Sequence, residues 1–169
     1  AIAFTWTQGC SNAGCEPVRI SVFDAGTGVV TVLTDPQELS AHFPSWSPDG
    51  SQLAYWAVSA SGRRIERMSP DGTNSVAVFD GGPNDTDLAW SPCGDQFAFT
   101  RTIAPRESRV MLLSEDGLAL RELTSGEQPS WSPDCSRLAF IRPFTEDSGI
   151  DVWIINADGS GERRLTRRD

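Results

Sequence analysis

The heptad "PSWSPDG", Pro44–Gly50, decides the fold because the chain repeats it. A near copy, "PSWSPDC", spans Pro129–Cys135, and a third version, "LAWSPCG", spans Leu88–Gly94. In such a stretch Pro restricts φ and Gly tolerates positive φ, so Ser-Pro-Asp-Gly predicts a tight turn after a short strand that ends at Trp. The heptad is therefore predicted to be a structural turn and not an active site.

The repeat extends well beyond the heptad. Trp46, Trp90 and Trp131 lie 44 and 41 residues apart, and eight residues after each comes an Ala between bulky residues, in "LAY", "FAF" and "LAF". A fourth copy, "IAF", opens the chain at Ile2–Phe4. Each unit then continues with a Gly-bearing turn and a closing strand that ends in "LT" or its equivalent. Four strands in about 40–45 residues are typical of one blade of a β-propeller.

The chain as a whole is predicted to be all-β. No stretch shows an apolar stripe at helical spacing, and 11 Pro with 15 Gly punctuate the sequence. Residues 42–80, 81–124 and 125–169 each hold four predicted strands, whereas residues 1–41 begin at the second strand of the pattern. We therefore predict one β-propeller domain or propeller fragment over residues 1–169. It has about four blades of four-stranded antiparallel sheet, and its first blade is incomplete.

The sequence does not decide how the ring of blades is completed. It can be part of a larger propeller, it can complete its ring by pairing with another copy, or it can close a four-blade ring by itself. Because each terminal blade would expose an uncapped face, we expect self-association or contact with other polypeptide at both ends.

The units resemble the WD-like repeat of TolB-type β-propellers. The resemblance rests on "PSWSPDGSQLAY" and on "SWSPDCSRLAFI" with "IDVWIINADGSGERRLT", and it covers essentially the whole chain. It implies the propeller fold and suggests a module that binds a protein or peptide. The motif is specific for the blade and says little about function.

Composition argues against several classes of partner. Fourteen basic residues against 23 acidic ones leave a net charge of −9, which disfavours nucleic acid. No apolar run is long enough to span a bilayer, so we predict no membrane insertion. All the basic residues are Arg, which excludes Schiff-base and P-loop chemistry within this chain.

One face of the predicted propeller is the candidate binding face. In a four-stranded meander the loops between second and third strands share a face with the blade-to-blade connections, and here these loops are the long, irregular ones. Binding residues concentrate on loops held by a rigid scaffold. The residues predicted to contact a partner are His42, Phe43, Arg106, Phe144 and Glu146.

Catalysis has little support in the sequence. His42 is the only histidine, no G-x-S-x-G motif is present, and no D-x-D-x-D-G calcium loop occurs. We therefore predict a non-enzymatic binding module without catalytic residues, metal or cofactor. One alternative is an accessory propeller domain of a prolyl-oligopeptidase-like serine peptidase. Another is a glycan-binding propeller, suggested by aromatic residues expected to be exposed: Trp6, Trp56 and Phe144.

The four cysteines predict two disulfides. Cys10 and Cys15 flank the short loop "CSNAGC", and a lone C-x₄-C pair lacks half the ligands of a zinc site. Cys93 and Cys135 occupy matching turns of successive units, which suggests a blade-to-blade bridge if their Cα atoms approach within about 7 Å. Both bridges predict an extracytoplasmic protein, whether periplasmic, at the cell surface or secreted.

Overall fold

The computed structural model describes residues 1–6, 10–11, 14–15, 17–34, 40–60, 62–143 and 149–166; for residues 10–11 and 14–15 only the backbone is described. The chain forms two compact units, Ala1–Pro83 (unit 1) and Asn84–Asp169 (unit 2). Among the described residues there is no α-helix, and none of the chain they cover could therefore cross a membrane as a helix.

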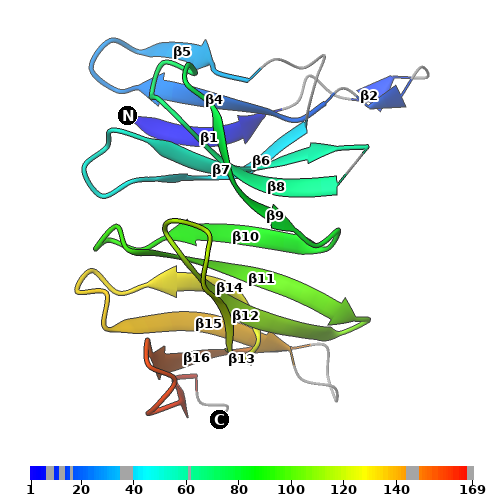
Figure 1. Cartoon of the computed structure of the whole chain (residues 1–169), viewed down its shortest axis with the longest axis vertical. Coiled ribbons are helices and arrows are strands. Elements are labelled where there is room, and N and C mark those ends of the chain that lie inside the picture. Colours follow the sequence, from blue (N-terminus) through cyan, green and yellow to red (C-terminus); the bar gives the residue numbers. More distant parts are fainter. Residues whose placement is uncertain are drawn as a thin grey trace. The chain divides into compact units, whose positions relative to one another are not determined.

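Unit 1 contains two antiparallel sheets and a small hairpin (Figure 1). The first sheet has the order β1-β4-β5 and consists of β1 (Ile2–Trp6), β4 (Arg19–Asp24) and β5 (Val29–Val32). The hairpin pairs β2 (Cys10–Ser11) with β3 (Gly14–Cys15). The second sheet has the order β6-β7-β8-β9 and consists of β6 (Ser40–Trp46), β7 (Leu53–Ser59), β8 (Gly62–Met68) and β9 (Val76–Gly81).

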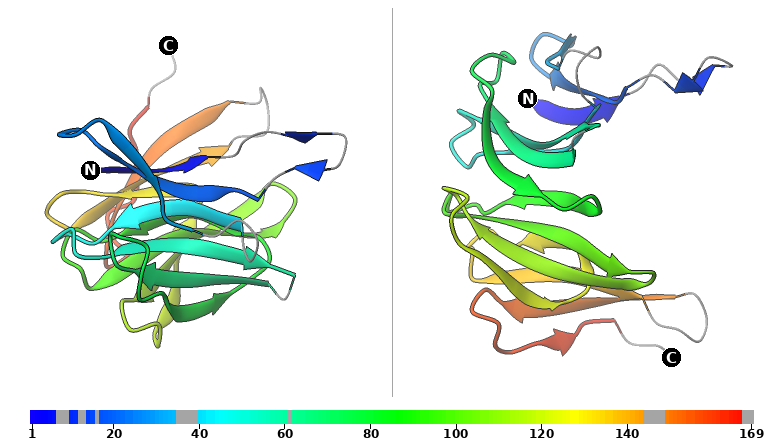
Figure 2. Two further views of the ribbon diagram at one scale, coloured as in Figure 1. Left: turned by 90° about the horizontal axis from the view of Figure 1, so that it is seen from above. Right: turned by 45° about the vertical axis from the view of Figure 1, so that its right-hand side comes forward.

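Unit 2 contains two four-stranded antiparallel sheets, seen from two further sides in Figure 2. One comprises β10 (Asp85–Trp90), β11 (Gln96–Ala104), β12 (Glu107–Ser114) and β13 (Leu120–Ser125). The other comprises β14 (Glu127–Trp131), β15 (Arg137–Pro143), β16 (Ile150–Asn156) and β17 (Arg163–Arg164).

These sheets confirm the predicted blades. Each sequence repeat forms one sheet whose strands are neighbours in chain order, and the first repeat supplies three strands because it lacks the strand that ends in Trp. The hairpin β2–β3 was not predicted and lies in the long connection between β1 and β4. Within each unit the core lies between the two sheets. In unit 1, for example, Ile20 of β4 packs in one cluster with Leu53 and Met68 of the next sheet.

The Ser-Pro-Asp-Gly turn forms through local hydrogen bonds. At Ser47–Gly50 the Gly50 amide donates to the Ser47 carbonyl at 3.0 Å, and Gly50 has φ of 69°. The carboxylate of Asp49 accepts from the Ser47 hydroxyl at 2.7 Å and from the Ser51 amide at 3.0 Å. The Ser132–Ser136 turn has the same bonds around Asp134. The Asp side chain of each Ser-Pro-Asp motif thus stabilises the tight turn that the motif predicts.

We expect Asp49 and Asp134 to titrate at unusually low pH. Each carboxylate accepts hydrogen bonds from the serine two residues before it (Ser47 or Ser132) and from the serine two residues after it (Ser51 or Ser136). These bonds stabilise the charged form and lower the pKa of each Asp from 3.8 to about 2. A ¹³C NMR titration of the carboxyl carbons should give midpoints near those values. Ser47→Ala should move the midpoint of Asp49 toward 3.8 and leave that of Asp134 unchanged. A midpoint near 3.8 for Asp49 in the unsubstituted protein would refute the interpretation.

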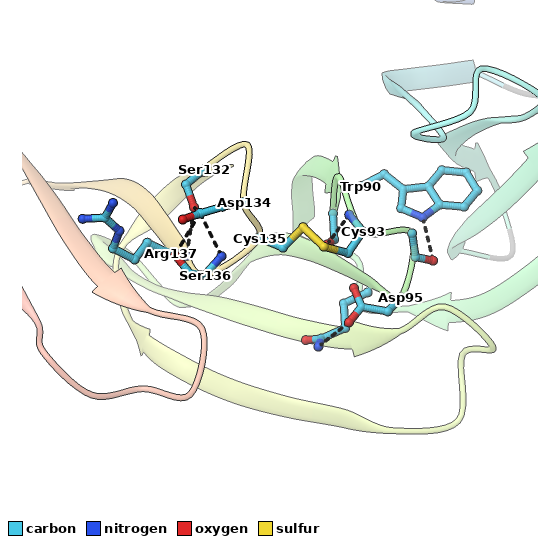
Figure 3. Close-up of a disulfide and its surroundings, with 11 residues drawn as sticks. Trp90, Cys93, Asp95, Ser132, Asp134, Cys135, Ser136 and Arg137 are labelled. Atoms are coloured by element: carbon cyan, nitrogen blue, oxygen red, sulfur yellow. Dashed lines mark hydrogen bonds between the residues drawn. A yellow bond between two sulfur atoms is a disulfide. The ribbon is translucent and has the colours of Figure 1, made fainter.

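The disulfide predicted between successive blades is confirmed. Cys93 and Cys135 are bonded, with their Cα atoms 6.0 Å apart, in the turns that follow β10 and β14 (Figure 3). Cys135 takes the place of the heptad glycine and has φ of 58°, a conformation that glycine adopts at lower cost. In the hairpin β2–β3 the backbone places Cys10 opposite Cys15. Their side chains lie outside the described residues, so that bridge stays a prediction.

Candidate binding site on the bulged first strands

The three first strands that end in Trp share a bulge. Each of β6, β10 and β14 pairs antiparallel with the strand that follows it. In all three pairs the register is interrupted by a bulge a few residues before the Trp. In each strand the residue three positions before the Trp has positive φ. These residues are Phe43 (φ 54°), Asp87 (φ 54°) and Gln128 (φ 56°).

This conformation is costly for residues other than glycine. A side chain with a Cβ atom meets steric hindrance in the left-handed region, and a bulky residue such as Phe is rarely found there. β-Bulges tolerate such residues because they reorient one side chain out of the regular strand alternation. Backbone strain of this kind concentrates at functional sites, so each bulge is by itself a candidate position for contact with a partner.

The side chains at the three bulges differ while the backbone is the same. Phe43 is 36% exposed, Gln128 is exposed, and Asp87 is half-buried and accepts a hydrogen bond from the Thr86 hydroxyl at 3.1 Å. A scaffold that holds an aromatic, an acidic and an amide side chain in equivalent positions suits recognition of a partner surface. We name Phe43, Asp87 and Gln128 the bulge residues.

The structure relates some of the predicted site residues to this feature. His42 precedes Phe43 in β6, and the two rings lie 6.1 Å apart at a tilt of 36°. Burial and the nearby positive charge of Arg63 lower the pKa of His42 below 6.5, so its imidazole is neutral at pH 7. Arg106 is exposed in the turn between β11 and β12 in unit 2, with φ of 66°. Phe144 and Glu146 lie outside the described residues.

Two of the bulge residues were missed by sequence reasoning. The sequence predicts only Phe43, because it lies in the long connection "DPQELSAHFP" between two blades. The signal that would have found Asp87 and Gln128 is their common spacing, three residues before a repeated Trp. The expectation for Trp56 was wrong, since its side chain is 0% exposed within β7. Trp6 is 45% exposed, as expected.

A buried ion pair fixes the start of the bulged strand in unit 2. Asp85, fully buried at the beginning of β10, accepts two hydrogen bonds from the Arg101 guanidinium, at 2.9 Å and 2.7 Å. Hydrogen bonding to this carboxylate raises the pKa of Arg101, so the guanidinium stays charged. The bidentate geometry holds β10 against β11 immediately before the bulge at Asp87.

In unit 1 a polar pair of residues stands where the other full blades have an apolar pair. Tyr55 of β7 pairs in register with Glu66 of β8, whereas the equivalent pairs in the other full blades are Phe99 with Met111 and Phe140 with Trp153. The pair forms part of the wall of a pocket of about 470 Å³. The pocket is lined by residues of the second sheet and its turns together with Leu33 and Thr34, which follow β5, and its apolar wall includes Leu33, Ala41, Met68 and Ala77.

Hydrogen bonds keep Glu66 ionised although it is only 5% exposed. Its carboxylate accepts from the Tyr55 hydroxyl at 2.5 Å, the Ser75 hydroxyl at 2.7 Å and Arg64 Nε at 2.5 Å. Burial opposes ionisation most strongly, but the three donors together outweigh it and the pKa of Glu66 is lowered from 4.5. Burial and the bond to Glu66 raise the pKa of Tyr55. An ionised carboxylate with three donors is a poor general acid or base near pH 7.

No metal-binding group emerges from the described residues. Among them, no cluster of three or more His, Cys, Asp or Glu side chains has the arrangement to hold a metal ion.

Solved structures show the fold of the chain. It is similar to TolB from Acinetobacter baumannii with a TM-score of 0.73 and 18% identity, over 95% of this chain. It is also similar to a chain of a nidogen/laminin complex (TM-score 0.69, 13% identity, 97% of this chain). A third is the acylaminoacyl peptidase of Pyrococcus horikoshii (TM-score 0.66, 14% identity, 98% of this chain). The fold is therefore that of a β-propeller.

The similarity covers only part of each of these proteins. This chain spans 39% of the TolB chain, 60% of the chain in the nidogen/laminin complex and 30% of the peptidase. No family model matches the chain.

Proposed function

We propose that this chain is a non-catalytic binding module that contacts a protein or peptide partner through Phe43 of unit 1 and the loop next to it. The observation that carries the proposal is the strained backbone at Phe43, which the repeat reproduces at Asp87 and Gln128 with different side chains. Similarity to TolB and to a chain of the nidogen/laminin complex supports a protein-binding role.

The proposed location is extracytoplasmic. The Cys93–Cys135 disulfide supports this, because such bonds persist in oxidising compartments. The similarity to TolB points the same way. Partners in such a compartment would meet a chain with net charge −9, which favours basic or neutral partner surfaces over nucleic acid.

Phe43→Gly is expected to separate stability from binding. Glycine relieves the left-handed strain but also removes a ring that is only 36% exposed, so the free energy of unfolding should change by less than about 1 kcal/mol. The probe is a set of peptides selected from a random library for binding to the immobilised chain. Loss of the exposed ring should weaken the affinity of the chain for these peptides at least about tenfold. Urea denaturation and fluorescence anisotropy would measure the two effects.

The matched control for this experiment is Leu118→Ala. Leu118 is 86% exposed in the turn before β13, so its replacement removes exposed apolar surface away from any bulge. The proposal predicts unchanged affinity for this variant. Equal losses from Phe43→Gly and Leu118→Ala, or a loss from Leu118→Ala alone, would show that the binding face was chosen wrongly.

An accessory propeller of a serine peptidase is the second candidate. It is favoured by the similarity to the acylaminoacyl peptidase, of which this chain matches 30%. That role requires a catalytic domain on the same polypeptide, and a G-x-S-x-G segment with Asp and His partners in the encoding gene would identify it. The glycan-binding alternative loses one of its aromatic residues with the burial of Trp56.

A further inference from the structure

The second sheet of unit 1 lacks an arginine that both sheets of unit 2 carry. Two residues after the triplets "LAY", "FAF" and "LAF" stand Ala57, Arg101 and Arg142. In unit 2 each guanidinium lies over the aromatic ring that ends its triplet, 5.5 Å from the centroid of the Phe99 ring and 5.3 Å from that of the Phe140 ring. Ala57 is 1% exposed and cannot supply a cation. Unit 1 therefore has the aromatic residue of this arrangement without the guanidinium.

The contacts of Arg142 define the place of its guanidinium. The group lies over the Trp153 ring, 4.4 Å from the centroid, as well as over the Phe140 ring. It donates to Thr124 Oγ1 at 3.1 Å and to Glu162 Oε1 at 3.0 Å. In unit 2 a guanidinium is thus held by two aromatic rings, a hydroxyl and a carboxylate that come from both of its sheets.

These four contact residues have counterparts in unit 1 at the same positions of the repeat. The strand register, the closing "LT" and the Gly-bearing turn identify them. The counterparts of Phe140, Trp153, Thr124 and Glu162 are, in this order, Tyr55, Glu66, Thr34 and Ser75. All four line the pocket of about 470 Å³, together with Ala41, the cross-strand partner of Ala57. The pocket therefore occupies the place where unit 2 holds the Arg142 guanidinium.

The wall of the pocket suits a cation. Glu66 is 5% exposed, and its pKa is lowered from 4.5, so its carboxylate is charged near pH 7. Its Oε2 accepts from the hydroxyls of Tyr55 and Ser75. Among the described residues its Oε1 accepts only from Arg64 Nε, at 2.5 Å. A carboxylate oxygen has two lone pairs, so Oε1 can accept one further hydrogen bond. Unit 1 thus supplies the carboxylate from Glu66, where unit 2 supplies it from Glu162.

Arg64 pairs with this carboxylate in the free chain and would compete with a ligand. Its side chain is 46% exposed, and the bond to Glu66 is its one hydrogen bond among the described residues. A guanidinium that enters the pocket can share Glu66 with Arg64 or replace it, and in either case the buried carboxylate keeps a cationic partner. Competition of this kind distinguishes a cationic ligand from an anionic one, which Arg64 would attract.

We propose that this pocket binds an arginine side chain of a partner polypeptide. The guanidinium lies over the Tyr55 ring and donates to the Glu66 carboxylate and to Thr34 Oγ1. Its methylene groups lie against the apolar wall that includes Met68. The net charge of −9 favours the approach of a cationic group. Phe43 is not among the residues that line this pocket, so the proposal does not depend on the contact at Phe43.

The test follows the two methionines of the chain by NMR with ¹³C-labelled methyl groups. Met68 lines the pocket, and Met111 lies in β12 of unit 2 and serves as an internal control. The probe is N-acetyl-arginine methylamide, which presents an arginine side chain as a peptide does. We expect a saturable shift of the Met68 methyl resonance with a dissociation constant on the order of 1 mM, and no shift of the Met111 resonance. Absence of a saturable shift at Met68 would overturn the proposal.

Two further ligands test the chemistry and the source of the guanidinium. The citrulline analogue of the probe has nearly the same shape without the charge and should bind at least about tenfold more weakly. Equal affinities of the two blocked compounds would contradict the proposal. Free L-arginine should bind no more tightly than the blocked probe. Binding of free arginine at least about tenfold tighter would assign the pocket to the amino acid and would overturn the proposal of a partner polypeptide.

Substitutions at Glu66 and Arg64 should act in opposite directions. Glu66→Gln removes the charge that pairs with the guanidinium and should weaken binding of the probe at least about tenfold. Glu122→Gln removes an exposed carboxylate of unit 2 and is the matched control, with unchanged affinity. Arg64→Ala removes the competing cation at a half-exposed position, so the chain should fold normally and bind the probe about three- to tenfold more tightly. Unchanged or weaker binding by Arg64→Ala would overturn the proposal, whatever the stability of Glu66→Gln.

A further variant tests whether the pocket is the place that Arg142 takes in unit 2. Ala57→Arg supplies a guanidinium from the chain itself, and Arg64→Ala in the same chain removes the like charge beside it. The double variant should lose binding of the probe, and a cooperative thermal transition would confirm that it is folded. A folded double variant that binds the probe as tightly as Arg64→Ala alone would overturn the proposal.

Discussion

Replacing Cys93 and Cys135 together by serine should lower the free energy of unfolding by about 2–4 kcal/mol. The bond closes a loop with a sequence separation of 42, and restriction of the unfolded chain by a loop of this size contributes at most about 4 kcal/mol. For a chain of this size the melting temperature should fall by roughly 5–15 °C. Urea denaturation followed by tryptophan fluorescence measures the change.

A second variant separates the bond from the backbone strain at Cys135. Cys135 has φ of 58° where the heptad otherwise carries glycine, so Cys93→Ser with Cys135→Gly should recover about 0.5–1 kcal/mol of the loss. An unchanged denaturation midpoint in the double serine variant would mean that the bond does not restrict the unfolded chain as argued. A further loss with glycine would contradict the strain at this turn.

Breaking the Tyr55–Glu66 pair on one side only should cost far more than replacing both residues. Glu66→Met leaves the Tyr55 hydroxyl in a buried site without its carboxylate partner, and we expect a loss of about 2–4 kcal/mol. Tyr55→Phe removes one donor from a buried carboxylate and should cost about 1–3 kcal/mol. The double variant reproduces the Phe99–Met111 pair of the next blade and should lie within about 1 kcal/mol of the unsubstituted chain. Additive losses in the double variant would show that the two side chains do not act as a pair.

The pH dependence of stability provides a separate test of the same pair. The pKa of Glu66 is lower in the folded protein than its ordinary value of 4.5. Its contribution is therefore present above pH 4.5 and is lost as the pH falls through the folded pKa. Between about pH 5 and pH 2 the unsubstituted chain should lose more stability than the double variant. Parallel pH profiles would contradict the assignment.

The sequence by itself determined the blades, their turns and one disulfide. These features depend on local rules or on strict repetition. Ser-Pro-Asp-Gly closes its turn through hydrogen bonds within a few residues, as at Asp49, and the same heptad recurs at one period. Cys93 and Cys135 could be paired from sequence because they occupy equivalent turns of successive sheets. In the structure the Cα atoms of these turns lie 6.0 Å apart, which is close enough for a disulfide.

Only the tertiary structure decided which side chains are strained, exposed or unpaired. The positive φ of Phe43 arises from a shift in register with β7, which depends on cross-strand pairing and not on the local residues. Trp56 is buried and Ile2 exposed because neighbouring strands cover one and not the other, although both are apolar residues in predicted strands. Burial and hydrogen-bond pairing depend on residues that are distant along the chain. A repeat pattern describes the strands of each blade but not the side chains that neighbouring strands place against them.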